Sequence, residues 1–285
     1  MVSTLLSECP VQPLRVRTRP HCEHMYDVLV NTQAKPGAPR PRTADQRPLA
    51  DAGGSRTEIL IGQLIDRIIS GVYPPGDTIP TEAQLGEAFG VSRTVVREAI
   101  KVLAEKQLVR VDRGRGTVVL PRREWRMLDA ANLSAQIRHG DRDVVIRELL
   151  VMRKGIEPEL AAIAAASATP EAIASIGACV DTLGRLVDDE PGYHIADGQF
   201  HEAIAEAAGI AIAVEFLRVM REPLDLGRQL TDLIPEGIAS AHQHHLEVFA
   251  AIAQQDATRA RSAMRRHLEW AEERLELALD PKRAR

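Results

Sequence analysis

The feature that most constrains the fold is a change in the spacing of apolar residues within residues 56–120. From Arg56 to about Lys106 apolar residues recur every three or four positions, which is the period of a helix. From Val109 to Leu120 they alternate with polar residues on both sides of a glycine-containing loop, which predicts a β-hairpin. Helices followed directly by such a hairpin predict a winged helix-turn-helix domain over residues 56–121.

Capping signals divide the helical part of this segment into three helices. Gly71 ends the first apolar run, and Thr81 with Gln84 three residues later has the pattern of a capping box. Gly90 is expected to end the second helix, and Ser92 is a good N-cap for a third helix through about Lys106. The short second and third helices therefore form the helix-turn-helix.

The rest of the chain has a helical period. After Pro121 we expect a connector over residues 122–140, with some helix around Trp125–Ile137. Residues 141–279 predict an all-α bundle of six or seven helices, so the fold class is mainly α. The expected breaks lie near Thr169-Pro170, Asp189–Gly192, Gly209, Leu233–Gly237 and Gln255-Asp256, and residues 280–285 form a tail.

Composition and charge agree with this division. Apolar residues make up 45% of the 285-residue chain but aromatic residues only 3%, which favours a core of packed helices over stacking platforms for bases or flat cofactors. The net charge is +2 over residues 1–55, +3 over 56–123 and −9 over 124–285. We therefore expect an anionic polymer to bind the first folded domain and not the second.

Several features bear on where the protein works. No apolar run approaches the ~20 residues that span a bilayer, and the N-terminus does not have the pattern of a secretory signal. The three cysteines, Cys9, Cys22 and Cys179, have no paired spacing, which is typical of a reducing cytosol. Residues 1–55 are rich in proline and arginine and predict a disordered extension, in which His21, Cys22 and His24 form either a metal-binding group or a chance cluster.

The start of the third helix carries candidate DNA contacts. Arg93 and Arg97 stand four residues apart with Thr94 beside them, so the three share one helix face. Arginine reads guanine in a bidentate manner, and the first residues of a recognition helix enter the major groove. Ser92 can donate to a phosphate. The residues expected to pack inward from the opposite face are Val96, Ile100 and Leu103.

The hairpin tip adds a second basic element. Arg113, Gly114 and Arg115 form a loop that could lie at the minor groove, where glycine permits a close approach. A solvated cationic helix face is the alternative for the arginines alone, but the capped helices, turn and basic wing together favour DNA binding.

Polar residues occupy inward positions of the helical domain. Asp197 and His201 lie one turn apart in one apolar stripe, and His245 and His267 each lie in another. Unpartnered buried imidazoles and carboxylates are costly, so these four side chains are expected to satisfy one another or to hold a divalent cation. Zinc fits Asp and neutral His best, and nickel and manganese are alternatives.

Individually satisfied histidines are the alternative to a metal site. His242 and His244 flank His245, but their stripes are mixed, so we assign both to solvent. Arg153 has two interpretations as well: a residue of a ligand site, or a surface arginine paired with Glu157 at i+4.

The ordered motifs resemble a known family. Gly71–Asp77, Val91–Ala99 and Gly114–Thr117 are similar to the DNA-binding domain of GntR-family regulators. That resemblance implies DNA contacts by Arg93, Thr94, Arg97 and the wing around Gly114. Two positions depart from the family: Ala83 replaces a DNA-contacting arginine of some members, and Gln107 replaces a glycine between helix and wing.

The helical domain resembles the effector domain of the FadR branch (the FCD domain) over essentially all of its length. The resemblance implies that Asp197, His201, His245 and His267 bind a metal and that Arg153 meets the carboxylate of an effector. Ile210 stands where an Asn is common. The connector around Val118–Asp129 resembles the subgroup of repressors of galactonate and related sugar-acid operons.

These observations predict a cytoplasmic, homodimeric transcriptional regulator, a repressor that a small carboxylate, such as a sugar acid, releases from double-stranded operator DNA. Catalytic residues are not expected, because the helical domain offers no added general base or nucleophile. The alternatives are a metal-dependent enzyme that uses the Asp/His₃ site, and a sensor for which the metal is itself the signal.

Overall fold

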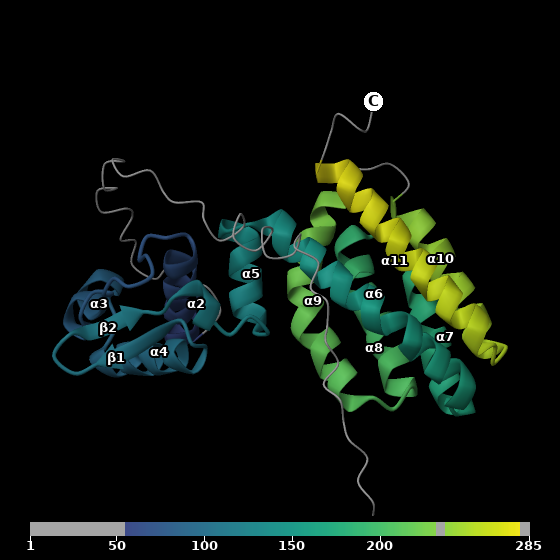
Figure 1. Cartoon of the computed structure of the whole chain (residues 1–285), viewed down its shortest axis with the longest axis horizontal. Helices are drawn as coiled ribbons and strands as arrows, with labels where there is room; N and C mark the ends of the chain where they lie inside the picture. Colours follow the sequence, from purple (N-terminus) through teal and green to yellow (C-terminus); the bar gives the residue numbers. More distant parts are fainter. Residues whose placement is uncertain (1–54, 232–236, 280–285) are drawn as a thin grey trace, which may run out of the picture. The chain divides into compact units, whose positions relative to one another are not determined.

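The structure is a computed structural model of the chain and describes residues 55–231 and 237–279. The predicted disordered extension (residues 1–55, apart from Ser55) and the tail therefore lie outside the described residues, as do His21, Cys22 and His24. The mainly α fold class is confirmed (Figure 1). Among the described helices, none combines the length and the apolar character that crossing a bilayer requires.

The first folded part has the predicted winged helix-turn-helix order. Its three helices precede a two-stranded antiparallel hairpin in which Val109 lies opposite Val119, and Thr78 forms an additional bridge to Val118. The elements are α2 (Arg56–Ile69), α3 (Glu82–Phe89), α4 (Arg93–Glu105), β1 (Val109–Asp112) and β2 (Gly116–Val119).

Local capping fixes where these helices begin and end. The Thr81 side chain accepts from the Gln84 backbone N–H, and the Gln84 side chain accepts from the Thr81 backbone N–H at 2.9 Å, which completes the predicted capping box. Gly90 ends α3 in the left-handed conformation at φ 64°. The Ser92 side chain caps α4 by accepting from Val95 N–H.

The core of this part lies between the three helices and the hairpin. Val96, Ile100 and Leu103 face inward as predicted. Gln107, between α4 and β1, has φ 57°, so a side-chain-bearing residue occupies the left-handed region where the family resemblance expects glycine. Other buried members of this core include Leu60, Leu64, Leu85, Phe89 and Leu108.

The predicted connector helix is wrong in its first turn. Residues Arg122–Glu124 form a short 3-10 helix, and α5 runs over Ala130–His139 and not from Trp125. The Asp129 side chain caps α5 by accepting from Asn132 N–H at 3.1 Å, whereas the Trp125 indole donates to Leu120 C=O at 2.8 Å. The N-cap and the burial of Trp125 in the core of the winged helix thus override the helical period.

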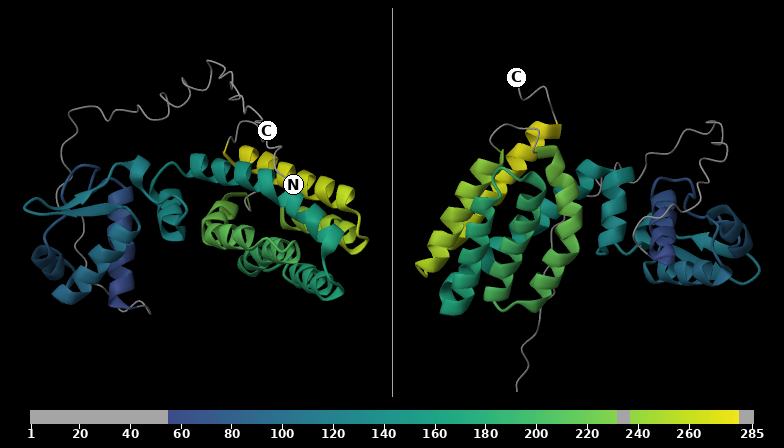
Figure 2. Two further views of the ribbon diagram at one scale, coloured as in Figure 1. Left: turned by 60° about the horizontal axis from the view of Figure 1, so that its bottom comes forward. Right: turned by 180° about the vertical axis from the view of Figure 1, so that it is seen from behind.

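The second folded part consists of six consecutive described helices, which confirms the lower of the two predicted numbers. Figure 2 shows from two sides that the long α6 runs alongside α11, and the two helices pack extensively. The expected break at Leu233–Gly237 falls largely outside the described residues, and α10 begins at Gly237. The helices are α6 (Arg142–Ser167), α7 (Pro170–Arg185), α8 (Glu190–Ala207), α9 (Ala211–Thr231), α10 (Gly237–Ala253) and α11 (Ala257–Leu279).

Small and branched apolar residues fill the interior of this part. Alanines allow close approach of the helices, and the few aromatic side chains in the core are concentrated on α8, with Tyr193 and Phe200 buried there. The largest group of core residues includes Leu149, Leu160, Ile176, Val180, Leu183, Ile204, Met220, Val248, Ile252, Met264 and Leu268.

Candidate functional site

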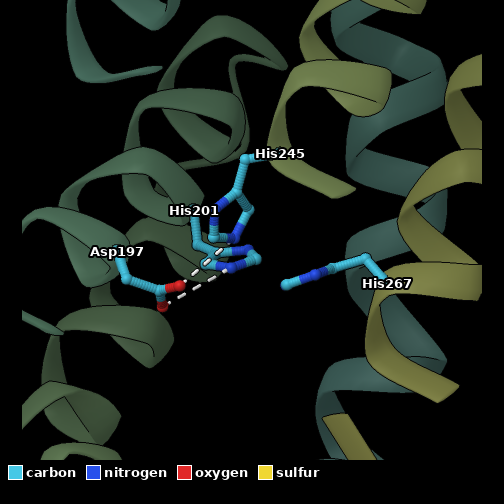
Figure 3. Close-up of side chains that lie close together, drawn as sticks. All are labelled: Asp197, His201, His245 and His267. Atoms are coloured by element: carbon cyan, nitrogen blue, oxygen red, sulfur yellow. Dashed lines mark ion pairs between the residues drawn. The ribbon is translucent and has the colours of Figure 1, made fainter. Parts of the chain in front are cut away.

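The four polar residues predicted for inward positions meet at one point in the helical domain. We call Asp197, His201, His245 and His267 the Asp/His group (Figure 3). One ligand atom from each side chain lies within 4.8 Å of the others, and all four residues are buried. The prediction that three separate helix faces bring these residues together therefore agrees with the structure.

The helices α8, α10 and α11 supply the group. Asp197 and His201 stand one turn apart on α8, so their side chains point in the same direction. His245 comes from α10 and His267 from α11, which pack against each other. Each position continues an apolar stripe, so burial of the helix face also buries the polar side chain.

Glu157 on α6 fixes the orientation of His201. Its Oε2 lies 2.5 Å from His201 Nδ1, while His201 Nε2 lies 3.7 Å from Asp197 Oδ2. Glu157 also forms a buried ion pair with Arg153. Burial alone would raise the pKa of the Glu157 carboxyl, but the charges of Arg153 and His201 outweigh it and lower that pKa to about 2.

Glu157 was not among the predicted site residues. The sequence indicated Glu157 only as the ion-pair partner of Arg153 on the surface. That surface interpretation is wrong, because Arg153 is 4% exposed and Glu157 is 1% exposed. Their i,i+4 pairing itself is present. The available signal was the apolar stripe around them on α6, which places both residues on an inward face.

Tyr193 fixes His245 in a similar way. The Tyr193 hydroxyl lies 3.1 Å from His245 Nδ1, and His245 Nε2 lies 3.2 Å from Asp197 Oδ1. Tyr193 precedes Asp197 by one turn of α8, so the same stripe that identified Asp197 could have identified it. Outer partners of this kind hold a ring so that its other nitrogen faces a metal.

His267 completes the group as a neutral imidazole. Its burial, together with the neighbouring His245 and His201, lowers its pKa well below the ordinary value. Its ring centroid lies 4.5 Å from that of His245 and 5.2 Å from that of His201. The neutral ring is the form that coordinates a metal.

The unsatisfied atoms test whether a metal fits here. Among the described residues, His201 Nε2 and His267 Nδ1 are buried and make no hydrogen bond. Buried polar atoms normally have partners, so these nitrogens need one. Three imidazoles and a carboxylate are a donor set that divalent transition metals accept, so the group could hold such a metal.

His242 and His244 do not point into solvent as predicted. Both side chains are half-buried, and burial lowers the pKa of each ring. The His244 ring lies 5.2 Å from the Trp270 ring, and the His242 ring lies against Gly184. They are nevertheless outside the Asp/His group, as the sequence indicated.

A cavity adjoins the Asp/His group. Arg153, Asp197 and His267 line it, so the arginine predicted for ligand contact does reach the same cavity as two members of the group. Arg153 is already paired with Glu157 through two of its nitrogens. Further lining residues are Ile146, Leu150, Tyr193, His194, Leu224, Ile238, Trp270, Arg274 and Leu275.

The predicted DNA-contact residues are exposed at the start of α4. Ser92, Arg93, Thr94 and Arg97 all face solvent. Arg97 Nε donates to Glu82 Oε2 at 2.8 Å, in a pair whose arginine side chain is 69% exposed. This side of α4 therefore presents hydrogen-bond donors to solvent, while the opposite side forms the core.

The wing tip is exposed as well. Arg113, Gly114 and Arg115 follow β1, and Gly114 has φ 77°, which explains the need for glycine in this turn. Arg115 donates to Gly76 C=O at 3.3 Å. Ala83 is exposed in the first turn of α3, so the position lacks the cationic side chain that some family members place there.

Ile210 lies immediately before α9. Its carbonyl accepts from Ala213 and Val214 N–H at 2.9 and 3.2 Å, and its side chain is 41% exposed. An Asn here would be placed as a helix N-cap, which is a structural role and not a contact with the cavity.

Comparison with known families identifies the class of protein. Residues 57–119 match "Bacterial regulatory proteins, gntR family", and residues 148–269 match "FCD domain". The first match covers the winged helix and the second contains the whole Asp/His group. The protein is therefore a transcription regulator and not an enzyme, which confirms that expectation.

Individual relatives agree. The Uxu operon regulator of Haemophilus influenzae is 32% identical over 75% of this chain and 80% of that protein. The Uxu operon transcriptional regulator of Escherichia coli is 33% identical over 82% of this chain and 88% of that protein. The galactonate operon transcriptional repressor of the same organism is 29% identical over 73% of this chain and 92% of that protein. The chain belongs to the GntR family of regulators with an FCD domain.

One solved structure supports the fold alone. The structure of Lar, which controls the expression of the Listeria monocytogenes agr system, matches with a TM-score of 0.58 at 16% identity. The match covers 80% of this chain and 99% of that one.

Proposed function

We propose that this protein is a dimeric repressor that binds double-stranded operator DNA and is released by a small carboxylate bound beside a metal. The observation that carries the proposal is that one chain combines an exposed cationic recognition helix with a buried Asp/His group next to a cavity. We propose that the protein works in the cytoplasm, because its three cysteines have no paired spacing.

The DNA contacts come from two elements. Arg93 and Arg97 read base edges, and Ser92 and Thr94 contact phosphates or a thymine methyl. The wing residues Arg113, Gly114 and Arg115 approach the minor groove. Two copies of the chain read two half-sites of a palindromic operator, because dimer symmetry is mirrored in the DNA.

The Asp/His group holds the metal, with Asp197, His201, His245 and His267 as its ligands. Zinc is the first candidate, and nickel and manganese are alternatives for the same donor set. Once bound, the metal would supply a Lewis-acidic anchor for a carboxylate or hydroxyl group. Glu157 and Tyr193 orient His201 and His245 for this role, and Arg153 offers to the carboxylate the guanidinium nitrogen that Glu157 does not use.

The relatives suggest which carboxylates to try first. One of them is named as a repressor of the galactonate operon, so sugar acids are the first class to test. Binding of such an acid would favour an arrangement of the dimer in which the recognition helices no longer match the operator half-sites.

The test measures operator affinity of the full chain with zinc, after chelation, and with added galactonate or glucuronate. We expect tight binding with zinc alone and weaker binding when the acid is added. Release by chelation with no response to any acid would instead indicate a sensor for the metal. His201→Ala and His245→Ala should each lose most of the bound zinc in elemental analysis, while His242→Ala and His244→Ala should retain it.

A further inference from the structure

Two arginines line the cavity beside the Asp/His group, and they differ in burial and in whether a carboxylate pairs with them. Arg153 is buried and already paired with Glu157. Arg274 on α11 is half-buried and lies with its guanidinium carbon 5.6 Å from the centre of the Trp270 ring. Within residues 55–231 and 237–279, Arg274 has no carboxylate partner and no hydrogen bond.

Several other arginines of the helical domain do have carboxylate partners. Arg147 pairs with Glu276, Arg221 with Glu202, and Arg261 with Glu159. Glu272 and Glu276, each two residues from Arg274, are already paired with Lys154 and Arg147. A guanidinium that faces a cavity without a counter-charge has an unused fork of donors suited to a carboxylate or phosphate.

The position of Arg274 places it away from the Asp/His group. It follows His267 by seven residues, which is two turns and about 10 Å along the axis of α11. Side chains of a helix lean toward its N-terminus, so the guanidinium extends back along the cavity toward His267. The residues of α11 that line the cavity, including Trp270 and Leu275, share this face.

The walls between these two ends are mainly apolar. Hydroxyl groups in the middle of a ligand would find few partners there, so recognition is concentrated at the ends. The apolar residues that line the cavity are Ile146, Leu150, Leu224, Ile238, Ala241, Trp270, Ala271 and Leu275.

We propose that Arg274 binds a second anionic group at the far end of the effector. The ligand is then a small acid with an anionic group at both ends: one beside the Asp/His group and Arg153, and one, a carboxylate or a phosphate, at Arg274. This inference rests on the proposed function, because it requires that an acid binds in this cavity.

The experiment compares three six-carbon acids that differ at their far end: gluconate, glucarate and 6-phosphogluconate. Calorimetry on the zinc-loaded full chain without DNA gives the affinity of each, for wild type, Arg274→Gln and the control Arg265→Gln. Arg265 is an exposed arginine of α11 that does not line the cavity. Zinc content and operator affinity are measured on the same samples.

We expect wild type to bind glucarate or 6-phosphogluconate about tenfold or more tightly than gluconate, since a charge-assisted pair is the stronger kind. Arg274→Gln should remove that difference, and Arg265→Gln should keep it. Tighter binding of glucarate would indicate that Arg274 prefers a carboxylate, and tighter binding of 6-phosphogluconate would indicate a phosphate.

Two results would overturn the inference: equal affinity of wild type for all three acids, or no binding of either glucarate or 6-phosphogluconate. If zinc content and operator binding stay intact in that case, only the role of Arg274 fails. A wild-type protein that holds no zinc or does not bind the operator would instead contradict the proposed function.

Discussion

Two arginine–glutamate pairs in this protein have the same chemistry and opposite surroundings. In the winged helix, Arg97 pairs with Glu82 at 2.8 Å with its side chain 69% exposed. In the helical domain, Arg153 pairs with Glu157 with its side chain 5% exposed. An exposed pair contributes little to stability, so Arg97 can exchange Glu82 for another partner at small cost.

The buried pair behaves differently. Neither partner can return to water, so each charge depends on the other and on the contact between Glu157 and His201. The exposed pair is therefore free to exchange partners, whereas the buried pair holds His201 of the Asp/His group in place.

The largest expected effect tests this contrast directly. Glu157→Ala leaves the Arg153 charge buried without a partner and should lower the free energy of unfolding by about 3–5 kcal/mol. Glu82→Ala should change it by less than about 1 kcal/mol. Denaturant unfolding of the full chain measures both, and comparable losses in the two variants would break the comparison.

The same burial affects how Arg153 can be studied. Arg153→Ala removes the cationic partner of the buried Glu157 carboxylate, so a weaker effector response in that variant would combine lost stability with a lost contact. Arg274→Gln avoids this problem, because Arg274 has no carboxylate partner among the described residues.

The second prediction concerns the exposed side of the comparison. Arg93→Ala or Arg97→Ala should weaken specific operator binding by about 1–3 kcal/mol if either residue reads a base. The free energy of unfolding and the zinc content should stay near wild type, because both side chains are exposed. Operator titrations at one fixed salt concentration provide the measurement, and near wild-type affinity for both variants would contradict the assignment.

Much of the winged helix could be predicted because its signals are local. Thr81, Gln84, Gly90 and Ser92 act within one turn of the backbone groups that they satisfy. The prediction that a helix begins at Trp125 failed because it depends on contacts with the core that are not local. Trp125 is held by Leu120 C=O and the core, and no periodicity in the sequence reports that contact.

The Asp/His group was also predictable, since each of its members interrupts an apolar stripe. Its supporting residues were not. An Arg and a Glu four residues apart have the same pattern on a surface as in a core, and only the packing of α6 against α8 shows that Glu157 reaches His201. The sequence thus predicted the four members of the group, but not the side chains of Glu157 and Tyr193 that orient them.

The third prediction measures how much the supporting residues matter. Tyr193→Phe removes the hydroxyl that lies 3.1 Å from His245 Nδ1 but keeps the ring in the core. Loss of such an outer partner should reduce zinc affinity by about 10–100-fold. Competition with a chromophoric chelator measures the affinity, and Tyr73→Phe, in the winged helix, is the control that should leave it unchanged.

The smallest expected effect compares the backbones of the two regions. Gln107 in the winged helix and Gln255 in the helical domain have φ of 57° and 55°, which is left-handed for residues with a side chain. That conformation costs about 1–2 kcal/mol in a residue with a Cβ, and glycine avoids the cost but loses about 0.5–1 kcal/mol in chain entropy. Gln107→Gly and Gln255→Gly should therefore each stabilise the protein by up to about 1 kcal/mol.

Gln63→Gly, inside α2, provides the matched control for this last prediction. Its backbone is helical, so the same change should destabilise the protein by about 1 kcal/mol. Thermal unfolding that follows each domain separately would show a rise confined to the winged helix for Gln107→Gly and to the helical domain for Gln255→Gly. A destabilisation in either variant would mean that the glutamine side chain makes a compensating contribution at that turn, and the two regions would then differ in how they tolerate a strained backbone.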